Sequence, residues 1–287
     1  MTETTFTRHL RDVIDGVDVI LSDIWGVVHN GLEAWPDACA ALTKFRQRGG
    51  KVVLITNAPR PAPSVQRMLR RLHVADDVYD AIVSSGDLTR SYIEEHRSQT
   101  VFHIGPERDH SLFEGFGVRF GDVESADYIV CSGLFDDETE TAEDYRATLT
   151  RARERDLFFV CANPDIVVER GEKLIFCAGA LAELYASLGG KVLFAGKPHP
   201  PIYQRALQLA AEAGATAVTP AHVLAIGDSV RTDLEGANGG GFRCVFVTSG
   251  IHANELGERA NPDAESVAKL FKGASKPPFA VTPKLMW

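Results

Sequence analysis

Residues 17–31 read VDVILSDIWGVVHNG, and the expected architecture of the chain starts from them. The apolar residues of this stretch are Val17, Val19, Ile20 and Leu21. They form a short, β-branched run, which is typical of a strand buried on both faces of a parallel sheet. We expect this strand to deliver Asp23 to its carboxyl end, the edge at which ligands bind in open α/β sheets. Gly26 would let the chain turn sharply and leave Asp23 accessible. An Asp shortly before a Gly is equally typical of an ordinary turn, so these residues alone do not establish a site.

The composition is that of an ordinary globular protein. Of the residues, 45% are hydrophobic and 24% are charged, as in most soluble globular proteins. The length of 287 residues is sufficient for one large α/β domain or for a domain with an insertion. The formal net charge is −9 and no dense stripe of Lys and Arg is present, so we do not expect nucleic acid or an anionic membrane surface as a partner. A few cationic groups at one point could still bind phosphate, so an anionic substrate is not excluded.

The cysteines and the N-terminal residues indicate a cytoplasmic protein. Five cysteines are scattered along the chain without a CxxC pair, which favours reduced thiols that fill core space. Residues 1–15 are polar and lack the apolar run of a signal peptide. No segment approaches the roughly 18 apolar residues that a membrane span requires.

Strand and helix patterns alternate along the rest of the chain. After the first strand, a helical pattern begins at Pro36 and stops at Gly49 and Gly50, and a second apolar run follows at residues 52–55. Strand, helix and strand in this order form a βαβ unit, which implies parallel pairing. Further strands are expected at residues 81–83, 101–105, 127–133, 157–165, 192–194, 223–226 and 243–247, and further helices at 65–72, 87–95, 141–155, 200–214 and 233–237.

Polar side chains stand where four of the expected strands end. They are Asp23, Thr56 with Asn57, Lys197, and Asp228 with Asp233 five residues later. If these strands are neighbours in one parallel sheet, the polar groups share a single crevice. Asp oxygens suit Mg²⁺, a hard cation that is often shared with a substrate phosphate. Lys197 and the Thr56 hydroxyl could then hold phosphoryl oxygens while Asp23 attacks phosphorus.

Two of these residues also have ordinary interpretations. Lys197 could be a solvated surface lysine, and Asp233 could be the N-cap of the helix that follows it. Taken singly, such interpretations are the more common ones, whereas the order and spacing of the whole set favour a site.

The set resembles the four motifs of the haloacid dehalogenase superfamily of phosphohydrolases, over about residues 17–250. The first motif is similar to DIWGV at residues 23–27, and the second to LITN at residues 54–57. The third is similar to GKPHP at residues 196–200, and the fourth to GDSVRTD at residues 227–233. The intervening segment contains SSGDLTR, CANPD and CAGALAEL, and it is similar to the cap of the NagD-like branch. That branch includes nitrophenyl, nucleotide, phosphoglycolate and pyridoxal phosphatases.

The resemblance implies both a fold and an activity. The fold would be α/β, with a Rossmann-like doubly wound core of residues 1–85 and 190–287 and a smaller α/β cap domain inserted at residues 86–189. The activity would be Mg²⁺-dependent hydrolysis of a small phosphorylated metabolite under a mobile cap. Relatives often pair through this cap, so a homodimer is a further expectation.

The resemblance also implies residue roles. Asp23 would be the nucleophile that forms an aspartyl-phosphate, and Lys197 would hold both the nucleophile and the phosphate. The residues implied to bind substrate are Thr56, Asn57, Asn163, Asp165 and Lys197. The residues implied to bind the metal are Asp23, Asp228, Asp233 and, through its backbone carbonyl, Trp25.

One position departs from the family pattern. Phosphatases of this family carry a second Asp two residues after the nucleophile, where it protonates the leaving group and then activates water, and this chain has Trp25 there. An indole cannot exchange a proton at neutral pH. Because a positioned acid or base contributes about 10²–10⁴-fold, we expect slow turnover, with aryl or acyl phosphates affected least.

Several explanations of Trp25 stay open from the sequence. His29 or His199 could carry the proton in place of the missing Asp, since histidine titrates near neutral pH. Trp25 could cover the site, or stack on a ring of the substrate. The chain could also be a phosphometabolite-binding protein that has lost turnover.

Overall fold

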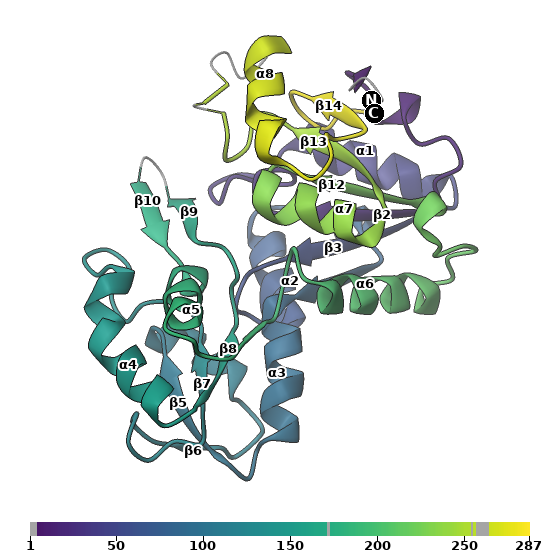
Figure 1. Cartoon of the computed structure of the whole chain (residues 1–287). Helices are drawn as coiled ribbons and strands as arrows, with labels where there is room; N and C mark the ends of the chain where they lie inside the picture. The colour runs from purple at the N-terminus through teal and green to yellow at the C-terminus, as the bar shows by residue number, and fades with distance from the viewer. Residues whose placement is uncertain (1–4, 171–172, 254, 257–263) are drawn as a thin grey trace. The chain divides into compact units, whose positions relative to one another are not determined.

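The computed structural model describes residues 5–170, 173–253, 255–256 and 264–287, and Figure 1 shows it. The chain divides into two compact units. The first unit consists of Met1–Thr56, Gln66–Val83 and Pro198–Trp287, and the second of Asn57–Val65 and Ser84–Lys197. Residues 1–4 of the polar N-terminal segment lie outside the described residues. Whether the second unit acts as a cap stays a prediction.

A seven-stranded sheet is the centre of the first unit, in the order β1-β14-β13-β12-β2-β3-β4. The strands are β1 (Thr5–Phe6), β2 (Val19–Asp23), β3 (Lys51–Thr56), β4 (Ala81–Ser84), β12 (Val223–Gly227), β13 (Arg243–Val247) and β14 (Ala280–Thr282). β2 pairs in parallel with both β12 and β3, and every residue of β2 is buried. The predicted parallel strand with two buried faces is therefore confirmed.

Helices cover both faces of this sheet. The helices of this unit are α1 (Pro36–Gln47), α6 (Pro200–Glu212), α7 (Glu235–Gly240) and α8 (Ala264–Leu270), and α2 (Ala62–Arg71) is divided between the two units. α1 and α6 pack against β3, and α7 packs against β13. Figure 1 shows α1 behind the strands and α7 in front of them. This arrangement confirms the predicted Rossmann-like, doubly wound α/β class.

The second unit has a five-stranded sheet in the order β11-β8-β7-β5-β6 and a separate antiparallel pair, β9 with β10. Its strands are β5 (Thr100–Ile104), β6 (Arg119–Phe120), β7 (Tyr128–Cys131), β8 (Phe158–Cys161), β9 (Val167–Arg170), β10 (Lys173–Phe176) and β11 (Val192–Phe194). Its helices are α3 (Ser85–Glu95), α4 (Arg146–Glu154) and α5 (Ala178–Ser187).

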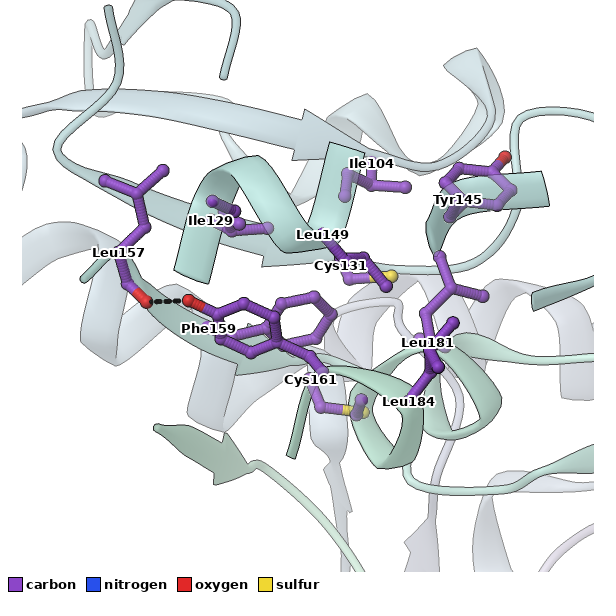
Figure 2. Close-up of a cluster of buried hydrophobic side chains, with 14 of the residues drawn as sticks. Ile104, Ile129, Cys131, Tyr145, Leu149, Leu157, Phe159, Cys161, Leu181 and Leu184 are labelled. Carbon is purple, nitrogen blue, oxygen red and sulfur yellow. Dashed lines mark hydrogen bonds between the residues drawn. The ribbon is translucent and has the colours of Figure 1, made fainter. Parts of the chain in front are cut away.

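Figure 2 shows the hydrophobic core that holds α4 and α5 on this second sheet. Cys131 and Cys161 are fully buried in it, as expected for cysteines that fill core space. The hydroxyl of Tyr185, on α5, donates a hydrogen bond to the Leu157 carbonyl at 2.5 Å, so this buried polar group is satisfied.

The position of β11 differs from the sequence expectation. The sequence predicts that residues 190–287 belong to the core domain, whereas β11 pairs in parallel with β8 in the five-stranded sheet and the division of the chain falls after Lys197. Three apolar residues can join any sheet edge that offers unpaired backbone groups, so the sequence of so short a strand does not specify its partner.

Other elements were not anticipated. β1 and β14 pair with each other at one end of the seven-stranded sheet, although their sequences are too short and too Pro-interrupted to indicate strands. The helix expected at residues 233–237 consists of a π-helical turn, Val230–Leu234, followed by α7. Within the part of the chain that the structure describes, no helix has the length and apolar character needed to cross a membrane.

Candidate active site

Three aspartates meet at the carboxyl ends of two neighbouring strands. Asp23 ends β2, and Asp228 and Asp233 follow β12, which is the parallel neighbour of β2. One carboxylate oxygen from each residue lies within 4.8 Å of the other two, and all three side chains are buried. The parallel strands bring these groups to one edge of the sheet, as the sequence predicted.

Backbone N–H groups orient each carboxylate. Asp23 Oδ1 accepts a hydrogen bond from the Ile24 N–H at 2.8 Å, and Asp228 Oδ2 accepts one from the Ile251 N–H at 2.7 Å. Asp233 Oδ2 accepts from the Ser229 N–H at 3.2 Å.

The N-cap interpretation of Asp233 is wrong. Ser229 occupies the N-cap position of the following turn, where its hydroxyl accepts from the Thr232 N–H at 3.4 Å. Asp233 instead lies inside the turn, with its carboxylate in the cluster.

Three glycines pack so closely against the carboxylate cluster that no side chain fits at their positions. A methyl group at Gly26 or at Gly250 would collide with the carboxylate of Asp228, and one at Gly227 would collide with that of Asp233. Gly26 also has a φ of +80°, a conformation that favours glycine. The sequence reasoning linked Gly26 only to a turn and missed Gly250, whose sole signal was its position shortly after β13.

The cluster fits an oxygen-preferring divalent cation. Three carboxylates this close together, each less than 10% exposed, repel one another unless a positive charge lies among them. Their oxygens are the ligands that hard cations such as Mg²⁺ prefer. Thr56 ends β3 beside β2 and is 8% exposed, so its hydroxyl comes from the same edge of the sheet.

A second group of predicted residues is joined by Asn57. The Asn57 amide donates to Asp165 Oδ1 at 3.0 Å and to the Lys197 carbonyl at 3.1 Å. Its Oδ1 accepts from the Lys197 N–H at 2.8 Å and from the Ser85 hydroxyl at 3.4 Å. These bonds occupy both donors and both lone pairs of the amide, so the Asn57 side chain links chain segments, and only its backbone N–H is left for a phosphate.

The Asn-Pro-Asp segment is part of the same network. Asn163 Oδ1 accepts from the Asp165 N–H at 3.1 Å, which shapes the turn that presents Asp165 to Asn57. Gly196 is required next to this network, because a methyl group there would collide with the Ser85 hydroxyl. The contacts of Ser85 and Gly196 with this network were not predicted from the sequence.

Lys197 is 3% exposed, so its interpretation as a solvated surface lysine is wrong. Lys197 follows β11, which lies in the five-stranded sheet and not beside β2. Its predicted role toward Asp23 therefore stays a prediction that the strand order does not support.

Trp25 lies two residues after Asp23 in the chain and directly before Gly26, and 41% of its surface is exposed. The benzene end of its indole rests on Gly31, where a methyl group would collide with the ring. Its ring also meets the imidazole of His29 at an angle of 74°, with 5.3 Å between the ring centroids.

His29 is poorly suited to replace the missing acid. Its side chain is fully buried, and burial lowers its pKa to about 4. Nδ1 accepts from the Gly31 N–H at 2.9 Å, so the proton of the neutral ring is on Nε2. That nitrogen has no hydrogen-bond partner among the described residues. Burial also lowers the pKa of His199, and the charge of Arg231 adds to this effect.

Known proteins resemble this chain in sequence and in fold. Residues 20–119 match the family described as haloacid dehalogenase-like hydrolase, and residues 194–274 match a related HAD-hydrolase-like family. The crystal structure of a hydrolase of the haloacid dehalogenase-like family from Brucella suis 1330 is 42% identical, with a TM-score of 0.85. The match covers 98% of this chain and 100% of that one.

More distant relatives have names that describe activities. The acid sugar phosphatase of Staphylococcus epidermidis is 26% identical over 82% of this chain and 88% of its own length. The ribonucleotide monophosphatase NagD of Escherichia coli is 25% identical over 81% of this chain and 88% of its own length.

Proposed function

Because this chain belongs to the NagD-like branch of the haloacid dehalogenase-like hydrolases, we propose that it is a Mg²⁺-dependent phosphohydrolase of small phosphorylated metabolites. The chain is a hydrolase of this family, and relatives named as phosphatases support phosphate esters as its substrates. The observation that carries the proposal is the buried cluster of Asp23, Asp228 and Asp233 at the edge of the core sheet.

The three carboxylates, with the backbone carbonyl of Trp25, would hold the cation. A bound Mg²⁺ supplies positive charge that offsets the repulsion between these carboxylates and a phosphate dianion. The collisions that larger residues would cause at Gly26 and Gly250 support a cluster geometry that tolerates little displacement.

The chemistry would begin at Asp23. Its carboxylate oxygen forms a bond to phosphorus while the bond between phosphorus and the leaving-group oxygen breaks, which gives an aspartyl-phosphate and a free alkoxide or aryloxide. The Thr56 hydroxyl and the Lys197 ammonium would hold the phosphoryl oxygens, and Asn163 and Asp165 would belong to the substrate side of the site. Water then attacks the aspartyl-phosphate, which releases inorganic phosphate and restores Asp23.

Proton transfer would be the slow part of the reaction. Trp25 cannot protonate the leaving group or activate the water, and the buried His29 is neutral at pH 7. The loss of a positioned acid and base corresponds to about 10²–10⁴-fold in rate. The same observations favour a second candidate function, a phosphometabolite-binding protein that retains the pocket and lacks turnover.

A panel of phosphoesters with the purified, Mg²⁺-loaded protein tests the proposal. Released phosphate and acid-stable covalent phosphate are measured together, because slow hydrolysis of the aspartyl-phosphate would make it accumulate. Asp23→Asn is the matched control and should abolish both signals. Absence of both from the unmodified chain would reject the phosphohydrolase and favour the binding protein.

Two other expectations stay proposals. We propose that the protein acts in the cytoplasm, which its free cysteines support, since Cys131, Cys161, Cys177 and Cys244 are buried thiols. We also propose that it pairs as a homodimer through the second unit, which sedimentation of the purified chain would test.

A further inference from the structure

We propose that Trp25 makes the site selective for phosphate esters whose leaving group is a planar aromatic ring. The exposed indole would bind that ring beside the carboxylate cluster. This inference rests on the proposed function, because it names the class of substrate that the same site accepts.

The backbone of Trp25 lies close in the chain to two members of the carboxylate cluster. It lies two residues after Asp23, the proposed nucleophile, and directly before Gly26, which touches the Asp228 carboxylate closely enough that a methyl group would collide with it. The chain is therefore close to the cluster on both sides of Trp25, at Asp23 before it and, through Gly26, at Asp228 after it. An ester whose phosphorus is bound at Asp23 would carry its leaving group within reach of a side chain as long as an indole.

The indole has a fixed orientation. Its benzene end rests on Gly31, and its ring meets that of His29 at 74°. The His29 ring is held in turn by the hydrogen bond from the Gly31 N–H. Two rigid neighbours thus support one part of the indole, while 41% of the side chain stays exposed. An aromatic ring that is already ordered loses little conformational entropy when a ligand binds to it.

The chemistry of the site favours the same class of substrate. The leaving group must depart without a proton from residue 25, since the indole N–H is not acidic enough to donate one. An aryloxide delocalises its negative charge into the ring and can leave as an anion, whereas an alkoxide cannot do so readily. A planar aryl group therefore meets two separate requirements of this site. It can stack on the indole, and it can leave without being protonated. A small acyl group meets only the second requirement.

Binding of two phosphonates tests this inference without turnover. Phenylphosphonate and cyclohexylphosphonate have the same charged group and six-carbon rings, and only the first ring is planar and aromatic. We expect isothermal titration of the Mg²⁺-loaded full chain to give a Kd that is about two- to tenfold lower for phenylphosphonate. Trp25→Leu should remove this preference, and Trp25→Phe should retain part of it.

A second tryptophan provides the matched control. Trp287 stacks against the Arg48 guanidinium at 5.7 Å in another part of the first unit, and Trp287→Leu should leave the preference unchanged. Equal affinities for the two phosphonates in the unmodified chain, or an unchanged preference in Trp25→Leu, would overturn the inference. If the proposed function is wrong, no ester in the panel releases phosphate. The difference in affinity between the two phosphonates can still be measured in that case, so the two failures are distinguishable.

Discussion

The side chain of Asn57 binds both backbone groups of Lys197, since its amide donates to the Lys197 carbonyl at 3.1 Å and its Oδ1 accepts from the Lys197 N–H at 2.8 Å. The two residues are 140 positions apart in the sequence. Segments that carry the second and third family motifs are therefore joined directly, by a side chain that the motif alone would assign to the phosphate.

Asn57→Ala should destabilise the protein by about 2–4 kcal/mol, because it leaves several buried partners without a hydrogen bond. Chemical denaturation of the two proteins measures the difference. Asn238→Ala is the control, since the Asn238 amide makes one solvent-exposed bond, to the Lys276 carbonyl at 3.0 Å, and its loss should stay below about 1 kcal/mol. A loss for Asn57→Ala as small as that of the control would mean that the network adds little stability.

Gly250→Ala should weaken Mg²⁺ binding at least about tenfold while the protein still folds, because the added methyl group must displace the Asp228 carboxylate. Isothermal titration gives the affinity, and circular dichroism checks the fold. Gly239→Ala is the control, since a methyl group there meets no other described residue within 4 Å outside its own helix backbone. Equal affinities in the two variants would show that the Asp228 position does not determine metal binding.

Removal of divalent metal should lower the stability of the protein. When the free metal concentration is 100 times the Kd, binding adds about 2.7 kcal/mol to the free energy of unfolding, and a chelator removes this stabilisation. Asp228→Asn should lose most of the metal effect, yet in chelator it should be at least as stable as the unmodified chain, because one of three repelling charges is gone. Asp15→Asn, at an exposed position, should retain the full effect. Thermal unfolding with and without chelator measures all three, and an unchanged midpoint in the unmodified chain would contradict the prediction.

Trp25→Asp should raise the hydrolysis of nitrophenyl phosphate by about 10²–10⁴-fold, because it supplies the carboxylate that residue 25 lacks. Trp25→Asn is the matched control, with a similar shape and no proton to exchange, and it should show no such gain. Release of nitrophenolate at saturating Mg²⁺ measures kcat and KM separately. If Asp and Asn at residue 25 gave the same rate, proton transfer would not be what limits this enzyme.

The stability of the protein should fall as the pH drops from about 6.5 to about 4, in part because of His103. Burial, and to a lesser extent the charge of His110, lower the pKa of His103 from 6.5 to about 4 in the folded state. In this window the unfolded chain binds a proton that the folded chain does not, so the free energy of unfolding rises with pH. Above pH 6.5 His103 is neutral in both the folded and the unfolded chain, so its protonation no longer lowers the free energy of unfolding.

His103→Gln should reduce this slope, and denaturation at a series of pH values measures it. The partly exposed His222, which shares a hydrogen bond with the Thr219 hydroxyl at 2.8 Å, provides the control variant His222→Gln. Identical slopes in the unmodified chain and in His103→Gln would assign the acid sensitivity to other groups.

The sequence predicts the parallel core and the position of Asp23 and Asp228 at the carboxyl ends of their strands, whereas the adjacency of those strands comes from the structure. A run such as that of β2 carries its own burial pattern, and the residue that follows a parallel strand always lies at its carboxyl end. These are local properties, so they can be read without knowing which strand is the neighbour. The departure at Trp25 is equally visible in the sequence.

Three features could be known only from the folded chain: the partner of β11, the burial of His29 and Lys197, and the hydrogen bonds of the Asn57 amide. Each of these depends on groups that are distant in the sequence. A three-residue strand pairs with whatever edge is offered, an imidazole is neutral or charged according to what surrounds it, and an amide is available to a ligand only if no backbone group has occupied it.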